Sequence, residues 1–295
     1  MKYNNIFITG ATGVVGKPIL QKIIDQGHNV FALSRSKKNN RWFSDLGVTK
    51  IEGDLFTESI YDDISDCDIE AIFHIAGVNK MCSKNPQGMF KANIEGTKEM
   101  LQLGNRLKIK KFIYTASSSC YGIPQRYPTN EQSKIDLQYP YALTKNLGEQ
   151  ISFHFGKLYN IPVVSLRLFN VFGPRARTSG TYGAVFGVFL AQKLAKKPLT
   201  IVGDGNQKRD FTHVLDIIDG LLKIANSEIK HDDAWEIGTG VNYSINQLYS
   251  MFKDKYNTDS VNIPDQRGNY RETLRVNDDL INLLNWQPKD RLREY

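Results

Sequence analysis

Short runs of β-branched and aromatic residues alternate with longer helix-periodic segments along the first half of the chain. A helix shows apolar positions three and four residues apart, whereas a buried strand shows a short continuous apolar run. Strands are predicted over residues 6–9, 30–33, 49–51, 71–75, 112–115 and 163–169, and helices over 14–26, 86–106 and 139–159. Strands separated by helices form parallel sheets, so the pattern predicts an α/β fold with a doubly wound parallel sheet.

The alternation becomes irregular after Pro174, and residues 178–183 are glycine-rich and indicate a loop. Two further helices and one short strand are predicted there, over 184–196, 215–225 and 200–202. We therefore expect a sheet domain over residues 1–170 and a smaller mixed region over 171–295. The chain is expected to cross back to the sheet once.

The composition is that of a folded globular protein. Hydrophobic residues make up 41% and charged residues 23% of the 295 positions, which excludes a disordered or collagen-like chain. No apolar stretch reaches the roughly 20 residues of a membrane span, and no signal-peptide core precedes the first predicted strand. Cys67, Cys82 and Cys120 are odd in number and have no partners at metal-ligand spacing. These features predict a cytoplasmic protein without a metal site.

The formal net charge is +7, from 38 Lys and Arg against 31 Asp and Glu. A positive protein attracts anionic partners, which include nucleic acids, membrane surfaces and phosphorylated small molecules. No basic block is longer than two residues, and no basic stripe is interleaved with aromatic residues. The scattered distribution of the basic residues therefore argues against a nucleic-acid partner. Phosphorylated small molecules remain possible ligands.

A glycine-rich loop joins the first predicted strand to the first predicted helix. Gly10 allows a tight turn, Gly13 lets the backbone approach a pyrophosphate, and Gly16 lets the helix pack against the strand. The unpaired N–H groups at the start of a helix bind anions. We expect a dinucleotide here, held by Gly10, Thr12, Gly13, Val14, Val15 and Gly16.

The end of the second predicted strand bears on the choice of cofactor. An acidic residue there holds the ribose hydroxyls of NAD, whereas an arginine accommodates the 2′-phosphate of NADP. This chain has Ser34 and Arg35, followed by Lys37 and Lys38. The segment favours NADP, but exposed basic loops are also common without a ligand, so both cofactors stay open. Asp54, after the third strand, either contacts the adenine or forms a turn.

Tyr141 and Lys145 lie four residues apart in a predicted helix and therefore share a face. A tyrosine with a pKa of ~10 is a weak base at neutral pH, and a nearby ammonium favours its phenolate form. Ser117, Ser118 and Ser119 follow the fifth predicted strand, at the sheet edge where ligands bind in such folds. A tyrosine–lysine pair alone is common on helix surfaces, and serines alone are common in polar loops. The occurrence of both in one chain predicts a catalytic site.

Nine motifs, in order along nearly the whole chain, carry a family resemblance. They are TGATGVVG (9–16), GDL (53–55), HIAG (74–77), NIEGT (93–97), SSSCYG (117–122), PYALTK (140–145), LRLFNVFGPR (166–175), GDGNQKRDF (203–211) and NWQP (285–288). The chain resembles the extended short-chain dehydrogenases/reductases, in the branch of nucleotide-sugar epimerases and dehydratases. The resemblance implies a Rossmann fold that binds NAD or NADP and a smaller C-terminal region that binds a nucleotide-diphosphate sugar. It also implies a homodimer formed through the helices around 86–106 and 139–159.

The resemblance assigns expected roles to single residues. Ser117 corresponds to the hydroxyl that hydrogen-bonds the sugar O4, Tyr141 to the base and Lys145 to the residue that orients it. Further cofactor contacts are expected at Leu55, Ala76 and Gly77, and diphosphate contacts at Asn170, Arg209 and Arg267. Asn93 and His213 are expected to be structural.

The reaction expected from this resemblance depends on the residues after Ser117. In the 4,6-dehydratases an Asp-Glu pair follows at once, and decarboxylases commonly keep the Glu, whereas this chain has Ser118 and Ser119. Serine hydroxyls cannot act as a carboxylate pair at neutral pH. The sequence therefore favours a 4-epimerase with a tightly bound cofactor. The alternatives are an NADPH-dependent 4-keto-sugar reductase, a dehydratase that uses another carboxylate such as Glu131, and a non-catalytic nucleotide sensor.

Overall fold

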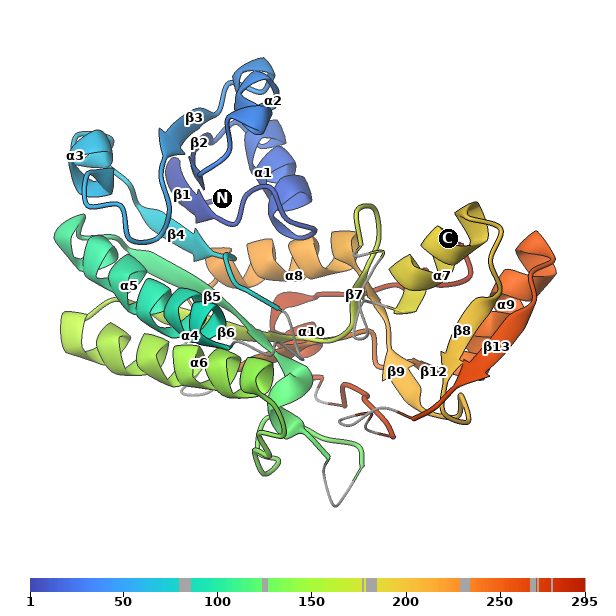
Figure 1. Cartoon of the computed structure of the whole chain (residues 1–295). Helices are drawn as coiled ribbons and strands as arrows, with labels where there is room; N and C mark the ends of the chain where they lie inside the picture. Colours follow the sequence, from blue (N-terminus) through green and yellow to red (C-terminus); the bar gives the residue numbers. More distant parts are fainter. Residues whose placement is uncertain are drawn as a thin grey trace.

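The computed structural model describes residues 1–79, 86–123, 127–176, 178, 185–228, 234–265, 269, 271–276 and 278–294. Seven parallel strands form the main sheet (Figure 1). From edge to edge they are β11 (Trp235–Ile237), β6 (Val163–Leu168), β5 (Lys111–Ser117), β4 (Ala71–His74), β1 (Asn5–Thr9), β2 (Asn29–Ser34) and β3 (Thr49–Glu52). The chain reverses its direction of winding next to β1, as in a doubly wound fold. The predicted Rossmann-type α/β class is confirmed.

Helices cover both faces of the sheet. On one face, α1 (Gly16–Asp25) and α8 (Val214–Asn226) bury aliphatic side chains such as Ile19, Ile23, Ile217 and Leu221 against the strands. On the other face, α5 (Gly96–Arg106) and α6 (Pro140–Tyr159) lie side by side (Figure 1). Side chains of this second helical layer pack with those of β4 and β5 in one hydrophobic core.

Close helix packing fixes the position of α6. A Cβ atom added at Gly148 would lie 2.3 Å from the Tyr114 hydroxyl oxygen and 2.9 Å from the Asn93 carbonyl oxygen. Asn93 lies in a π-helical turn (Lys91–Glu95) that joins the short α4 (Gln87–Phe90) to α5. π-Helical turns are frequent at functional sites. The absence of a side chain at Gly148 lets α6 approach both this turn and β5.

The second half of the chain adds a smaller lobe beside the sheet (Figure 1). Helices α7 (Val185–Leu194) and α9 (Ile245–Tyr256) pack with short strands around an aromatic core that includes Phe172, Phe186, Phe189 and Phe252. The strand pairs are β7 (Val171–Phe172) with β10 (Thr212–His213), β9 (Lys208–Asp210) with β12 (Asn242–Ser244), and β8 (Leu199–Val202) with β13 (Ser260–Ile263). The remaining short elements are η1 (Lys37–Asn39), α2 (Asn40–Asp45), α3 (Ile60–Ile64), η3 (Ser118–Tyr121) and α10 (Asp279–Leu284).

The predicted strands and helices of the first half are confirmed to within a few residues. The helix expected from residue 14 begins at Gly16, and Val14 and Val15 belong to the preceding turn. In the second half, β11 returns to the sheet and pairs with β6. Helices α9 and α10 and the strands β7, β9, β10, β12 and β13 have no counterpart among the predictions. Residues 179–183 of the expected loop and Cys82 lie outside the described residues, and the domain division near residue 170 stays a prediction. Within the described part of the chain, no helix has the length and apolar character needed to span a membrane.

Candidate active site

A cavity of about 750 Å³ opens at the carboxyl ends of the central strands. Its walls come from the segments that follow β1 to β6, together with two side chains of α6. The predicted site residues that line it are Gly10, Thr12, Gly13, Val14, Val15, Ser34, Arg35, Asp54, Leu55, Ala76, Gly77, Ser117, Ser118, Ser119, Tyr141, Lys145 and Asn170. Open α/β sheets bind ligands at this edge. The fold therefore brings seventeen positions, spread over 160 residues of chain, to one cavity.

The glycine loop forms the wall next to α1. Gly10 has a φ of +73°, and a Cβ there would lie 2.6 Å from the Ala76 backbone nitrogen. A Cβ at Gly16 would clash with the Gly10 carbonyl oxygen, so only glycine lets the start of α1 pack this closely against the turn. Gly16 is not among the lining residues. Gly13 stays on the cavity side. This cradle of bare backbone at a helix start fits the pyrophosphate of a dinucleotide.

Tyr141 and Lys145 lie in the first two turns of α6 and line the same cavity. The Lys145 side chain is 5% exposed, and its Nζ lies 4.3 Å from the centre of the Tyr114 ring. Burial lowers the pKa of Lys145 to about 7, and the nearby Glu149 carboxylate opposes this shift. The amine is thus buried one helical turn from the tyrosine.

Asn93 holds the loop after β4 against α6. Its Oδ1 accepts a hydrogen bond from the Val78 N–H at 2.7 Å, and its Nδ2 donates to the Val78 carbonyl at 2.9 Å and to the Thr144 Oγ1 at 2.9 Å. Gly77 and Val78 line the cavity. The side chain therefore joins the loop after β4 to α6, in agreement with the structural role that the sequence predicted.

Ser117 is the last residue of β5, and Ser118 and Ser119 begin the short helical turn η3 that follows it. The Ser119 N–H donates to the Ser117 Oγ at 3.2 Å. Ser118 and Ser119 are buried, and the Ser119 Oγ has no hydrogen-bond partner among the described residues. All three line the cavity with Tyr141. An unpaired buried hydroxyl is costly, so Ser119 offers a donor and acceptor to a polar ligand.

The comparisons with known proteins agree with this geometry. Residues 6–238 match the model of the NAD dependent epimerase/dehydratase family, which is more than half of the chain. The chain belongs to this family.

Individual relatives of the family carry different activities. A putative UDP-glucose 4-epimerase of Methanocaldococcus jannaschii is 29% identical, over 98% of this chain and 95% of its own length. UDP-glucuronic acid decarboxylase 2 of Arabidopsis thaliana is 27% identical, over 98% of this chain and 66% of its own length. The crystal structure of UDP-glucuronic acid 4-epimerase from Bacillus cereus, in complex with UDP-glucuronic acid and NAD, superposes with a TM-score of 0.88 at 26% identity, over 98% of this chain and 96% of that one. The chain therefore belongs to a family of nucleotide-sugar enzymes, which includes both epimerases and decarboxylases.

Carboxylates are scarce in the cavity of this family member. Among its described lining residues the only acid is Asp54, which follows β3 and whose Oδ1 accepts from the Phe56 N–H at 2.9 Å. Glu131, which the sequence suggested as an alternative carboxylate for a dehydratase, is not a lining residue. Its Oε1 accepts from the Glu236 backbone N–H at 3.2 Å. The expectation that Glu131 could serve a dehydratase is therefore not supported by its position, because the carboxylate faces the β11 backbone.

The three residues expected at the diphosphate lie in different settings. Asn170 lines the cavity, and its Nδ2 donates to the Asp210 carbonyl at 3.0 Å and to Thr273 Oγ1 at 2.9 Å. Arg209 is not a lining residue, and its guanidinium donates to the Lys208 carbonyl and to Asn269. Arg267 lies outside the described residues. Their diphosphate roles stay predictions.

A buried ion pair behind Lys145 was not predicted from the sequence. Arg167 on β6 donates to both carboxylate oxygens of Glu149 on α6, at 2.6 and 3.2 Å, and Ser165 donates to the same carboxylate at 3.0 Å. Arg167 also donates to the Tyr121 hydroxyl at 3.0 Å, at the end of the serine turn. The spacing Tyr141–Lys145–Glu149, four residues each, could have placed Glu149 on the same helix face. Its partner on β6 could be found only from the fold.

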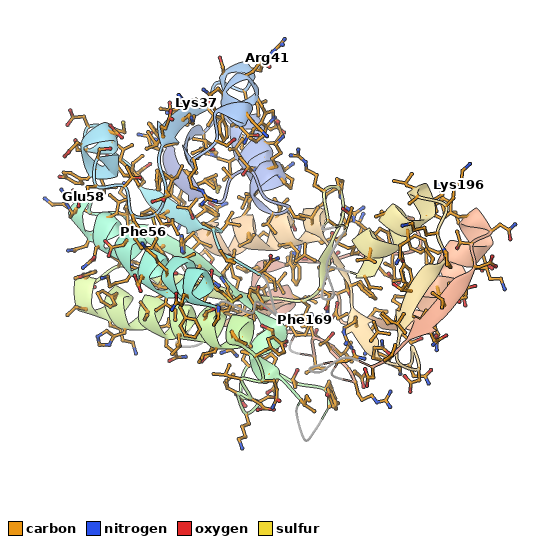
Figure 2. The ribbon with its side chains drawn as sticks, in the orientation of Figure 1. Lys37, Arg41, Phe56, Glu58, Phe169 and Lys196 are labelled. Atoms are coloured by element: carbon orange, nitrogen blue, oxygen red, sulfur yellow. The ribbon has the colours of Figure 1, made fainter. Side chains whose placement is uncertain are left out.

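The side chain of Phe56 is a second feature missed by the sequence analysis. It lines the cavity after β3, and the Lys91 Nζ lies 4.6 Å from its ring centre. Figure 2 labels Phe56 over α5. An aromatic ring in this position suits the flat adenine of a dinucleotide.

Proposed function

We propose that this protein is a nucleotide-sugar 4-epimerase, which inverts C4 of the sugar by transient oxidation and re-reduction with a bound nicotinamide dinucleotide. The family membership supports a nucleotide-sugar enzyme, and the geometry of the reacting end favours epimerisation within it. The substrate class is a nucleotide-diphosphate sugar.

In this proposal Tyr141 accepts the proton of the sugar O4 as C4 is oxidised and returns a proton as C4 is reduced. Lys145 favours the phenolate through its positive charge and contacts the nicotinamide ribose. The Ser117 hydroxyl hydrogen-bonds O4 and keeps it within reach of the phenolate. The bound nicotinamide supplies the chemistry that these side chains lack, because it can accept and return a hydride.

One observation carries the choice of reaction. Ser118 and Ser119 stand next to Ser117 in the cavity, and the only acid among the described lining residues, Asp54, follows β3 on the side of the glycine loop. Elimination of water needs an acid to protonate the leaving hydroxyl and a base to remove a carbon-bound proton. Among the described lining residues no carboxylate accompanies Tyr141, so elimination of water from a 4-keto sugar lacks its acid–base pair. Reduction of the ketone on its other face then inverts C4. The small serines also leave space for the sugar ring to turn.

The direct test is to incubate the purified protein with a panel of nucleotide sugars and to analyse the products by mass spectrometry and NMR. An unchanged mass with an inverted C4 supports the proposal. Loss of water, or loss of carbon dioxide, would contradict it and indicate a dehydratase or a decarboxylase.

A matched pair of tyrosine variants tests the assigned base. Tyr141→Phe should lower turnover by about 100- to 10,000-fold, the usual contribution of acid–base catalysis, while the dinucleotide stays bound. Tyr159→Phe is the control, because Tyr159 ends the same helix roughly 27 Å away at 1.5 Å per residue. Full activity of Tyr141→Phe would remove the assignment.

A 4-keto-sugar reductase is the second candidate. The observation that favours it is the basic segment after β2, where Ser34 and Arg35 line the cavity, since a reductase must exchange NADPH with solvent. Net consumption of NADPH, equal to the product formed, would identify a reductase. An epimerase regenerates its cofactor in each cycle and consumes none.

We also propose a homodimer through α5 and α6. The outer side of α6 carries the exposed Leu147 and Leu158 together with the half-buried Ile151 and Phe155. These apolar positions recur at helical spacing and would be covered by a second copy. Light scattering of the wild type and of Leu158→Glu tests this, with a dimer expected for the first and a weaker dimer for the second; a wild-type monomer would contradict it.

A further inference from the structure

A buried acid that the proposed mechanism does not use lies next to the end of η3. Glu236 is the middle residue of β11, and its register partner on β6 is Arg167. The side chain of Glu236 is 1% exposed, and neither oxygen of its carboxyl has a hydrogen-bond partner among the described residues. Buried polar groups are normally hydrogen-bonded, so this unpartnered acid requires an explanation.

The buried bases around Glu236 are already engaged by other acids. Glu131 and Glu149 are buried as well, and the Arg167 guanidinium donates to both carboxylate oxygens of Glu149. Arg275 pairs at 2.8 Å with a carboxylate three residues further along the chain. An ionised Glu236 would therefore have no counter-charge of its own among the described residues. Its carboxyl is favoured in the neutral form.

The groups that face the Glu236 carboxyl agree with a neutral acid at pH 7. Burial raises the pKa of Glu236 to about 8, and the Glu131 carboxylate adds to this rise, while the Tyr121 hydroxyl and the two arginines oppose it. The titratable and charged groups in question are Cys120 and Tyr121 on η3, Glu131 in the loop before α6, Arg167 on β6 and Arg275 after β13.

Tyr121 links this acid to the reacting end of the cavity. It is the last residue of η3, whose first two residues, Ser118 and Ser119, line the cavity. Its hydroxyl accepts from Arg167 Nη1 at 3.0 Å and keeps its own proton to donate. The hydroxyl and the Glu236 carboxyl lie close enough to shift the pKa of one another. A carboxyl in this position can accept the phenolic proton and hold the end of η3.

Ionisation of Glu236 would disturb the same contacts. A charged Glu236 on β11 would compete with Glu149 for the guanidinium of its register partner, Arg167. Glu149 lies on α6 one helical turn after Lys145. A shift of Arg167 towards β11 would therefore alter the packing of α6 as well as that of η3.

We propose that Glu236 is a positioning residue for the proposed epimerisation, and that its neutral carboxyl holds Tyr121 and Arg167 so that the serines of η3 and Lys145 of α6 keep their places. The inference rests on the proposed function, because its consequence is a change in the turnover of a nucleotide sugar. The charge of Glu236 is measured without turnover.

Carbon-13 NMR of the protein with labelled glutamate carboxyl groups measures that charge. One carboxyl resonance should move between pH 7 and pH 9 and should be missing from the spectrum of Glu236→Gln. Glu58→Gln removes an exposed acid (Figure 2) and should leave this resonance in place. A Glu236 resonance that has finished its titration below pH 6 would overturn the proposal, because the carboxyl would then be charged at pH 7.

Two substitutions separate a hydrogen-bonding group from a charge. Glu236→Leu has no polar atom and should lose at least tenfold in kcat at pH 7, while it still binds the dinucleotide, which shows that it is folded. Glu236→Gln is uncharged but can donate and accept, so it should recover most of this loss. The ratio of kcat of the wild type to that of Glu236→Gln should fall about tenfold between pH 7 and pH 9. Ionisations common to both proteins, such as that of Lys145, cancel in this ratio.

The contrary outcomes are distinct. A ratio that does not change with pH, a Glu236→Gln variant as slow as Glu236→Leu, or full activity of Glu236→Leu would each overturn the positioning role and leave the proposed epimerase standing. Absence of turnover by the wild type would overturn the proposed function and the positioning role with it, even where the NMR titration finds a neutral Glu236.

Discussion

Replacement of Lys145 by methionine should stabilise the cofactor-free protein at neutral pH while it removes activity. The side chain is buried beside His74 on β4, Tyr114 on β5 and Glu149 on α6. Burial without a direct carboxylate partner makes its charged form unfavourable in the folded protein. Methionine has a similar length and no charge, so Lys145→Met removes this penalty and retains most of the packing.

The magnitude follows from the shift in pKa. The pKa of Lys145 falls from 10.5 in the unfolded chain to about 7 in the folded protein. Between these values the unfolded state binds more protons, so the stability of the wild type rises with pH. The penalty is fully present below pH 7 and disappears as the pH rises through the unfolded value of 10.5. From the linkage relation, Lys145→Met should be more stable by about 4 kcal/mol at pH 7, about 2 kcal/mol at pH 9 and less than about 0.5 kcal/mol at pH 10.5.

Urea unfolding of both proteins between pH 7 and pH 10 measures this difference. His74, whose pKa burial lowers to about 3, stays neutral throughout this range and does not contribute. A difference in unfolding free energy that is independent of pH would refute the argument, because it would mean that Lys145 titrates alike in both states. A variant less stable than the wild type at pH 7 would refute it as well.

Three further substitutions test the packing around the site by urea denaturation. Glu149→Gln should destabilise the protein by about 3–5 kcal/mol, since it leaves the buried Arg167 without its counter-charge; a loss below about 1 kcal/mol would show that the pair is solvated. Gly148→Ala should cost about 1–3 kcal/mol, because its new methyl group would overlap the Tyr114 hydroxyl, and an unchanged midpoint would show that α6 can shift freely. Trp286→Ala should cost about 3–5 kcal/mol through the cavity it leaves, and a neutral effect would show that the segment near residue 286 does not belong to the core.

The central sheet could be predicted because its signals are local. Buried parallel strands appear as continuous apolar runs, and the glycine loop, the serine turn and the tyrosine–lysine pair each lie within a few residues of a strand end or helix start. Topology then brings these segments to one cavity. A sequence read in this way therefore locates most of the candidate site.

The remaining features depend on contacts between distant segments. The strands of the pairs β9–β12 and β8–β13 have only three or four residues, and each pair joins residues more than 30 positions apart. The sequence predicts β8, but no periodic pattern indicates which strand pairs with which. The pairing of Glu149 with Arg167 could not be predicted either, because the two residues lie on different elements, α6 and β6. Arg209 shows a further limit: its guanidinium donates to Asn269, it is not among the described lining residues, and its expected diphosphate contact stays a prediction. A motif gives the position of a residue along the chain but not the direction of its side chain.

The fate of a deuterium atom placed at C4 of the nucleotide sugar tests the central claim most directly. If Tyr141 and the bound dinucleotide oxidise and reduce the same carbon, NMR of the product should show the deuterium back at C4 with inverted configuration, and none in water or in free cofactor. Deuterium found at C6 would indicate a dehydratase. Deuterium lost from C4 to water or to released cofactor would contradict the account.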